Sequence, residues 1–161
     1  LKINPNGWIP VISWDGGAMY ECAAITIFLC DRHQDANLAP GLHSPLRSLF
    51  LQTLVYFSSS IQTAFQQHYH PYRFADKMED EAGAQRRGQK RLIETFRIID
   101  DQIGENEWIL GKRFSAADIY LYMLTTWLKP VREHPELSCF PNVQRIARQA
   151  CVRPSVKLVY G

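Results

Sequence analysis

The chain has 161 residues, of which 46% are apolar and 21% are charged, a composition typical of a globular protein with one large domain or one domain and part of another. A formal net charge of +2 is too small to indicate nucleic-acid binding, and no apolar run is long enough for a membrane-spanning helix. The cysteines form no CxxC pair and no zinc-finger spacing, so we expect reduced thiols, a cytoplasmic location and no metal site; they are Cys22, Cys30, Cys139 and Cys151.

The first thirty residues predict two short strands followed by a helix. Pro10 is compatible with a strand only at its first residue or on a sheet edge. Two strands and one helix bury too little surface to be stable alone, so we expect further strands to precede Leu1. The predicted elements are a turn at 4–7, a strand at 9–14, a hairpin turn at 15–17, a strand at 18–20 and a helix at 21–30.

The remainder of the chain predicts a linker and then helices only. Gly83 and Gly88 are expected to weaken the first half of the second long helix. Apolar residues recur at spacings of three and four, which is the period of a helix buried on one face. The predicted elements are a linker at 32–43 and helices at 44–70, 80–103, 115–128 and 141–151, with a short last helix after Pro154.

The segment from Phe114 to Leu128 predicts the central helix of that part. Ser115 can cap the helix by accepting a backbone N–H, while the Asp118 carboxylate can reach back to the N–H of Ser115, as in a capping box. Phe114 and Ile119 occupy the positions of a hydrophobic staple. Because apolar residues cover every face of this helix, we expect it to be buried on all sides.

Two motifs in this order resemble a known family. The pattern Asn4-Pro-x-Gly-x-Ile9-Pro10-Val11-Ile12, followed by Asp15-Gly16-Gly17 and Tyr20-Glu21-Cys22-Ala23-Ala24-Ile25, resembles the second half of the thioredoxin-like domain of cytosolic glutathione S-transferases. The segment Phe114–Ile119 resembles the capping box and staple of that family's helical domain. The resemblance covers essentially the whole chain. It implies a mainly α fold, in which residues 1–31 are the ββα remnant of the thioredoxin-like α/β domain, 32–43 a linker and 44–161 the all-helical C-terminal domain.

The resemblance also implies a glutathione site. Ile9 resembles the residue whose backbone pairs with the cysteinyl part of glutathione, and Pro10 resembles the cis-proline that presents it. Without the motif, the residues alone favour a trans proline at the start of a strand, because few X–Pro bonds are cis. Glu21 would bind the γ-glutamyl amine, or else only complement the helix dipole. Cys22 stands where the family usually has serine, which weakens its side-chain contact, and Trp8 covers either the ligand or the sheet.

The family's catalytic group, a Tyr, Ser or Cys, is expected upstream of Leu1, so no catalytic residue is assigned within this chain. Candidates for the electrophile pocket are Tyr56, Ser60 and Trp127, chosen by residue type, although aromatic residues at helical spacing are more often core residues. The resemblance implies a homodimer formed through the helices at 45–70 and 80–103. No nucleic acid or membrane is expected as a partner.

These observations favour a detoxifying transferase that joins the thiolate of its co-substrate glutathione to a hydrophobic electrophile, with the fragment alone expected to be inactive. A second hypothesis is a non-catalytic glutathione-transferase-like module that binds a ligand or serves as a scaffold. The substitution by Cys22 favours the second hypothesis slightly, whereas the retained Ile9-Pro10 pair and Glu21 favour a working ligand site.

Overall fold

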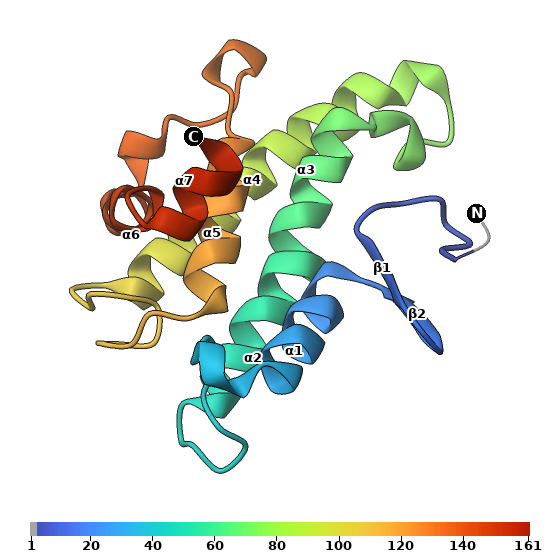
Figure 1. Ribbon diagram of the computed structural model, residues 1–161. Helices are drawn as coiled ribbons and strands as arrows, with labels where there is room; N and C mark the ends of the chain where they lie inside the picture. Colours follow the sequence, from blue (N-terminus) through green and yellow to red (C-terminus); the bar gives the residue numbers. More distant parts are fainter. Residues whose placement is uncertain (1–2) are drawn as a thin grey trace.

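The computed structural model describes residues 3–161 and is mainly helical, with one antiparallel hairpin near its N-terminus (Figure 1). Strand β1, Val11–Trp14, pairs with β2, Gly17–Tyr20, in the register that places Val11 opposite Tyr20. The helices are α1 Cys22–Arg32, α2 Arg47–Tyr56, α3 Gln62–Tyr69, α4 Glu81–Ile103, α5 Ala116–Thr126, α6 Pro141–Cys151 and α7 Pro154–Tyr160. None of the described helices is both long enough and apolar enough to cross a membrane.

The long helix expected at residues 44–70 is interrupted in its middle. A π-helical turn, Phe57–Ile61, joins α2 to α3, so the helical path runs from Arg47 to Tyr69 with one irregular turn. The hydroxyls of Ser58 and Ser59 both donate to the carbonyl of Val55, at 3.1 and 2.8 Å. Side-chain donors that compete for helix carbonyls in this way favour an irregular turn. The prediction of one regular helix was therefore wrong at this turn.

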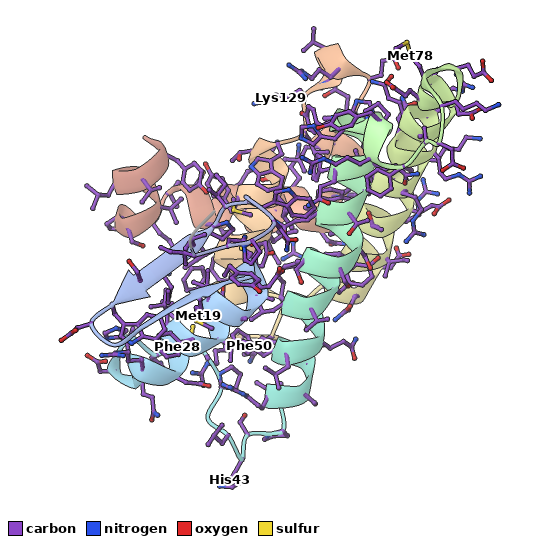
Figure 2. The ribbon with its side chains drawn as sticks, turned by 90° about the vertical axis from the view of Figure 1, so that its right-hand side faces the viewer. Met19, Phe28, His43, Phe50, Met78 and Lys129 are labelled. Carbon is purple, nitrogen blue, oxygen red and sulfur yellow. The ribbon has the colours of Figure 1, made fainter. Side chains whose placement is uncertain are left out.

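The start of α2 also differs from the expectation. Ser44 Oγ accepts the N–H of Leu46 at 3.3 Å, so the residues predicted to open the helix form a turn ahead of Arg47. The Arg47 guanidinium makes two hydrogen bonds of 2.9 Å to the carboxylate of Asp31 and one of 3.1 Å to the carbonyl of Pro40. This paired, fork-shaped contact ties the end of α1 to α2 across the connecting loop, whose tip carries His43 in Figure 2.

Helices α3 and α4 pack most closely at Gly88. A Cβ atom on that residue would lie 2.6 Å from the backbone nitrogen of His68. Only a glycine therefore lets the two backbones approach to this distance. The sequence-based expectation that Gly88 merely weakens the helix was incomplete, because its missing side chain is what allows the packing. Gly83 makes no such approach, since its nearest neighbour would be an Arg86 side-chain atom at 3.9 Å.

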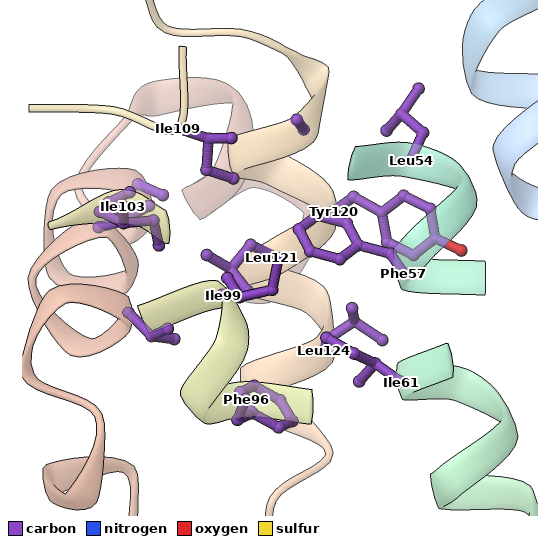
Figure 3. Packing of buried hydrophobic residues seen from close by; sticks show 14 of the residues in the cluster. Leu54, Phe57, Ile61, Phe96, Ile99, Ile103, Ile109, Tyr120, Leu121 and Leu124 are labelled. Atoms are coloured by element: carbon purple, nitrogen blue, oxygen red, sulfur yellow. The ribbon is translucent and has the colours of Figure 1, made fainter. Parts of the chain in front are cut away.

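Helix α5 is the central helix, as predicted. Tyr120, Leu121 and Leu124 are buried and lie between two walls of apolar side chains (Figure 3). One wall comes from α2 and the π-helical turn, and the other from α4. The first wall includes Leu54, Phe57 and Ile61, and the second Phe96, Ile99 and Ile103. Because each of these residues lies at a spacing of three or four from the next, the helical period in the sequence correctly indicated this core.

The capping box at the start of α5 is present. Ser115 Oγ accepts the N–H of Ala117 at 3.3 Å, and Asp118 Oδ2 accepts the N–H of Ser115 at 2.8 Å. Asp118 does more than the pattern indicated, because its Oδ1 also accepts the N–H of Ile109 at 2.9 Å. The carboxylate thereby fastens the loop before α5 to the helix. Phe114 packs edge-on against Trp108, with ring centroids 4.8 Å apart.

Candidate functional site

A cavity of about 560 Å³ opens between the segment that precedes β1 and the carboxyl ends of α3 and α5. A volume of this size suits a small organic molecule. Segments that are far apart in the chain converge on it. Its lining residues are Ile9 from the N-terminal segment, Gln62, Phe65, Gln66, Tyr69 and His70 from α3 and its end, and Thr126, Trp127, Lys129 and Arg132 from the end of α5 and the turn after it.

The apolar wall of the cavity is aromatic and well supported. Phe65 meets Trp127 edge to face, with ring centroids 5.5 Å apart. The Tyr69 hydroxyl donates to the carbonyl of Trp127 at 3.3 Å, which links α3 to the end of α5. The Arg132 guanidinium lies 5.2 Å from the centroid of the Tyr69 ring. Aromatic rings held in this way provide a flat, rigid surface for an apolar ligand.

The N-terminal edge of the cavity is the segment Trp8–Pro10. The Ile9–Pro10 peptide bond is cis, as the resemblance implied, and the Ile9 side chain is 92% exposed. Trp8 stacks beneath the Arg73 guanidinium, 4.9 Å from the ring centroid, so this ring contacts the loop after α3. Asn4 Nδ2 donates to the carbonyl of Trp8 at 2.8 Å. The segment is thus fixed from both sides while Ile9 borders the cavity.

Glu21 has an unusual backbone conformation, with φ 77° and ψ 112°. A positive φ is uncommon for a residue other than glycine and costs free energy, and such residues concentrate at functional sites. Glu21 immediately precedes α1, and among residues 3–161 no side chain caps the first N–H groups of that helix. Free N–H donors and the positive end of the helix dipole can bind an anion, with the exposed Glu21 carboxylate beside them to bind a cation.

The Cys22 side chain faces the helical part of the molecule. Its thiol neighbours the Tyr120 hydroxyl, which donates to Gln62 Oε1 at 2.7 Å. Burial raises the pKa of the Cys22 thiol, so the thiol form predominates at neutral pH and the side chain is a poor nucleophile. Tyr120, which neighbours the start of α1, is thereby hydrogen-bonded to Gln62, one of the cavity's lining residues.

The structure separates the three candidates for an electrophile pocket. Trp127 lines the cavity. Tyr56 faces α4, where its hydroxyl donates to the carbonyl of Thr95 at 3.4 Å, and Ser60 lies half-buried in the π-helical turn outside the cavity lining. Residue type alone did not single out the other lining residues. The available signal was position, because Pro71 and Pro130 end the two helices whose last turns form the wall.

Two histidines pack beside the aromatic wall. His68 and His134 are both 4% exposed, with ring centroids 4.5 Å apart. His134 Nδ1 accepts the N–H of Lys129 at 2.9 Å, and burial lowers the pKa of this imidazole, with a further contribution from His68. Within residues 3–161 no group of three or more histidine, cysteine or acidic side chains is placed to hold a metal ion.

Comparison with known proteins places the chain among relatives of similar architecture. Residues 82–151 match the family model described as the glutathione S-transferase C-terminal domain. The chain is 24% identical over 158 residues to glutathione S-transferase GstA of Escherichia coli O157:H7, covering 98% of this chain and 74% of that protein. It superposes on a sphingomonad glutathione S-transferase, solved in complex with glutathione, with a TM-score of 0.82 and 25% identity over 98% of this chain and 74% of the other.

Residues 82–151 thus carry the glutathione S-transferase C-terminal domain, and the chain as a whole is similar to bacterial glutathione S-transferases in sequence and fold. A further relative of known structure, a glutathione transferase family member from Pseudomonas fluorescens Pf-5 with two glutathione molecules bound, is 27% identical with a TM-score of 0.79. That alignment covers 98% of this chain and 72% of the other. The glutathione-transferase-like fold accounts for the order of elements, in which a hairpin and one helix precede the helical part.

Proposed function

We propose that this glutathione S-transferase homologue binds glutathione along Trp8–Pro10 and at Glu21 and Cys22, and directs the tripeptide's sulfur toward the aromatic cavity. The observation that carries the proposal is the position of Ile9. Its backbone lies in the segment that the resemblance assigns to the cysteinyl part of glutathione, and the same residue borders the cavity. A sulfur held there would face a second substrate lying against Trp127.

The charges of glutathione match the groups at the start of α1. The γ-glutamyl ammonium would be bound by the exposed Glu21 carboxylate, a charge-assisted contact. The γ-glutamyl carboxylate would lie against the uncapped N–H groups of α1, where the helix dipole favours negative charge. Cys22 would contribute its backbone N–H and not its thiol, because the thiol is directed toward Tyr120.

The proposed reaction is transfer of the glutathionyl group to an electrophilic carbon. The thiol loses its proton to solvent water, the thiolate forms a carbon–sulfur bond, and a leaving group such as chloride departs with the electron pair of the broken bond. Glutathione is the co-substrate, and no metal takes part. The side chain that stabilises the thiolate is proposed to lie before Leu1, as the resemblance implies, so none is assigned among the described residues.

We further propose a cytoplasmic homodimer. Helices α2 and α4, which are linked by the hydrogen bond from Tyr56 to Thr95, each carry an exposed apolar side chain, Val55 at 52% and Ile98 at 51%. Closed two-fold pairing is the commonest way in which a protein covers such side chains. The thiols of all four cysteines are free, as suits a reducing compartment.

A non-catalytic binding module is the alternative, and the inward-facing Cys22 thiol favours it. Conjugation of glutathione to 1-chloro-2,4-dinitrobenzene, followed by absorbance, distinguishes the two. Turnover by the enzyme with its proposed N-terminal segment, reduced on Glu21→Ala, supports the transferase. Saturable glutathione binding without any turnover supports the module. Absence of glutathione binding altogether would contradict both.

A further inference from the structure

The charges that line the cavity are of one sign. Lys129 and Arg132 both contribute to its wall, and none of the lining residues is an aspartate or a glutamate. Neither cation belongs to an ion pair among the described residues, whose salt bridges are Arg47–Asp31, Lys77–Glu79 and Arg91–Glu94. Glu133 follows Arg132 in the chain and shares with it and Tyr69 a neighbouring hollow, but Glu133 is not part of the cavity lining. The positive charge at this end of the cavity is therefore not neutralised by an acidic side chain of the lining.

The aromatic wall beside these cations provides a flat apolar surface. The rings of Phe65, Tyr69 and Trp127 are held by edge-to-face packing and by the Tyr69 hydrogen bond to the carbonyl of Trp127. Lys129 follows Trp127 by two residues, and the Arg132 guanidinium lies over the Tyr69 ring. Aromatic surface and cationic groups are thus adjacent in one cavity. A ligand with an aromatic body and an anionic end would satisfy both.

We propose that the second substrate of this cavity is an aromatic anion, an aryl electrophile bearing a carboxylate or sulfonate that lies against Lys129 and Arg132. The role of this ligand as the electrophile rests on the proposed transferase function. The binding preference for an aromatic anion does not depend on turnover, so it can be measured separately. In this arrangement the aromatic body would lie on Trp127 and Tyr69.

The size of the preference follows from the exposure of the two cations. Both side chains are exposed, and ion pairs at exposed positions are weak, typically 0.2–1 kcal/mol each. Two such contacts together favour an anion over a neutral ligand of the same shape by about two- to thirtyfold. Because exposed charges are screened by salt, this preference should nearly vanish at about 1 M ionic strength, where the Debye length is about 3 Å.

The test compares two ligands of the same shape, naphthalene-2-carboxylate and naphthalene-2-carboxamide, by calorimetric titration into the chain at low salt. We expect the carboxylate to bind more tightly by the factor above. The double variant Lys129→Gln/Arg132→Gln should bind both ligands equally, with the carboxamide affinity unchanged. The matched control Lys112→Gln/Arg97→Gln removes the same total charge from exposed positions outside the cavity lining and should keep the preference.

Several results would overturn the proposal. The carboxamide could bind as well as the carboxylate, or the control double variant could lose the preference as fully as the cavity variant. Glutathione titrated into the same variants separates this proposal from the function on which it rests. If Lys129→Gln/Arg132→Gln weakens glutathione instead, the cations serve the tripeptide and the proposal fails while the function stands. If glutathione does not bind the unmodified chain but the carboxylate preference persists, the proposed function fails and the charge preference stands.

Discussion

Replacing Asp118 by alanine tests whether one buried carboxylate joins the central helix to the loop before it. Its side chain is fully buried. It accepts the N–H of Ile109 at 2.9 Å, the N–H of Ser115 at 2.8 Å and the hydroxyl of Ser115 at 3.0 Å. Alanine removes all these acceptors at once and leaves two backbone N–H groups without a partner, because Ile109 is 4% exposed and Ser115 is fully buried.

The expected loss follows from those two donors. A buried donor left unpaired costs about 1–3 kcal/mol, so together they cost about 2–6 kcal/mol. Burial raises the pKa of Asp118, while the hydrogen bonds from Ile109 and Ser115 act in the opposite direction. The alanine variant also lacks a carboxylate whose charged form is disfavoured by burial, which offsets part of this loss. We therefore expect the free energy of unfolding to fall by about 3 kcal/mol in total. Ser115→Ala removes only the hydroxyl and should cost about 0.5–2 kcal/mol.

Urea denaturation measures both losses. With a slope of about 2 kcal/mol per molar, Asp118→Ala should lower the unfolding midpoint by about 1.5 M. The exposed residue Asp101 provides the control, since Asp101→Ala should change stability by no more than about 0.5 kcal/mol. Because Ser115 and Asp118 share a hydrogen bond, the double variant should lose less than the two single losses added together. Asp118→Ala costing no more than Ser115→Ala would refute this account of the cap.

Further predictions concern packing, pH and assembly. Gly88→Ala should destabilise the fold by about 1–3 kcal/mol in the same assay, because its Cβ would lie 2.6 Å from a backbone atom of α3. Gly83→Ala, by contrast, should leave the free energy of unfolding unchanged or raise it by up to about 1 kcal/mol. Burial lowers the pKa of His134, so the contribution of its neutral imidazole to stability is complete above pH of about 6.5 and is lost as the pH falls through the lowered pKa. The urea midpoint of His134→Asn should therefore fall less than that of wild type between about pH 7.5 and pH 5. An equal fall of the two midpoints would count against this. Light scattering should give twice the 18.6 kDa chain mass, and Val55→Asp should give the monomer; a wild-type monomer at micromolar concentration would contradict the dimer.

The helical core could be predicted from the sequence because its signals are local. Leu92, Phe96, Ile99 and Ile103 repeat at spacings of three and four, and all four are buried in α4. The capping box is equally local, since its residues are adjacent in the chain. What the pattern could not show was the contact from Asp118 to Ile109, because that bond joins the helix to a loop nine residues earlier.

The candidate site was predictable only in part. Of the motif residues, Ile9 lines the cavity, while the glutathione-binding roles of Pro10 and Glu21 stay predictions. The positive φ of Glu21 has no signal in the residue type, since nothing but the surrounding structure holds a non-glycine residue there. The aromatic wall was missed apart from Trp127, because segments more than fifty residues apart form it and no spacing in the sequence brings them together.

The central claim is that the start of α1 binds the γ-glutamyl end of glutathione through Glu21. Calorimetric titration of glutathione into wild type, Glu21→Ala and the control Glu105→Ala, an exposed glutamate on a distant loop, tests it most directly. Losing a hydrogen bond to a charged group costs about 1.5–3 kcal/mol, so Glu21→Ala should bind about ten- to a hundredfold more weakly, with the control unchanged. Equal affinities for wild type and Glu21→Ala would contradict the claim and leave Glu21 only a residue that complements the helix dipole.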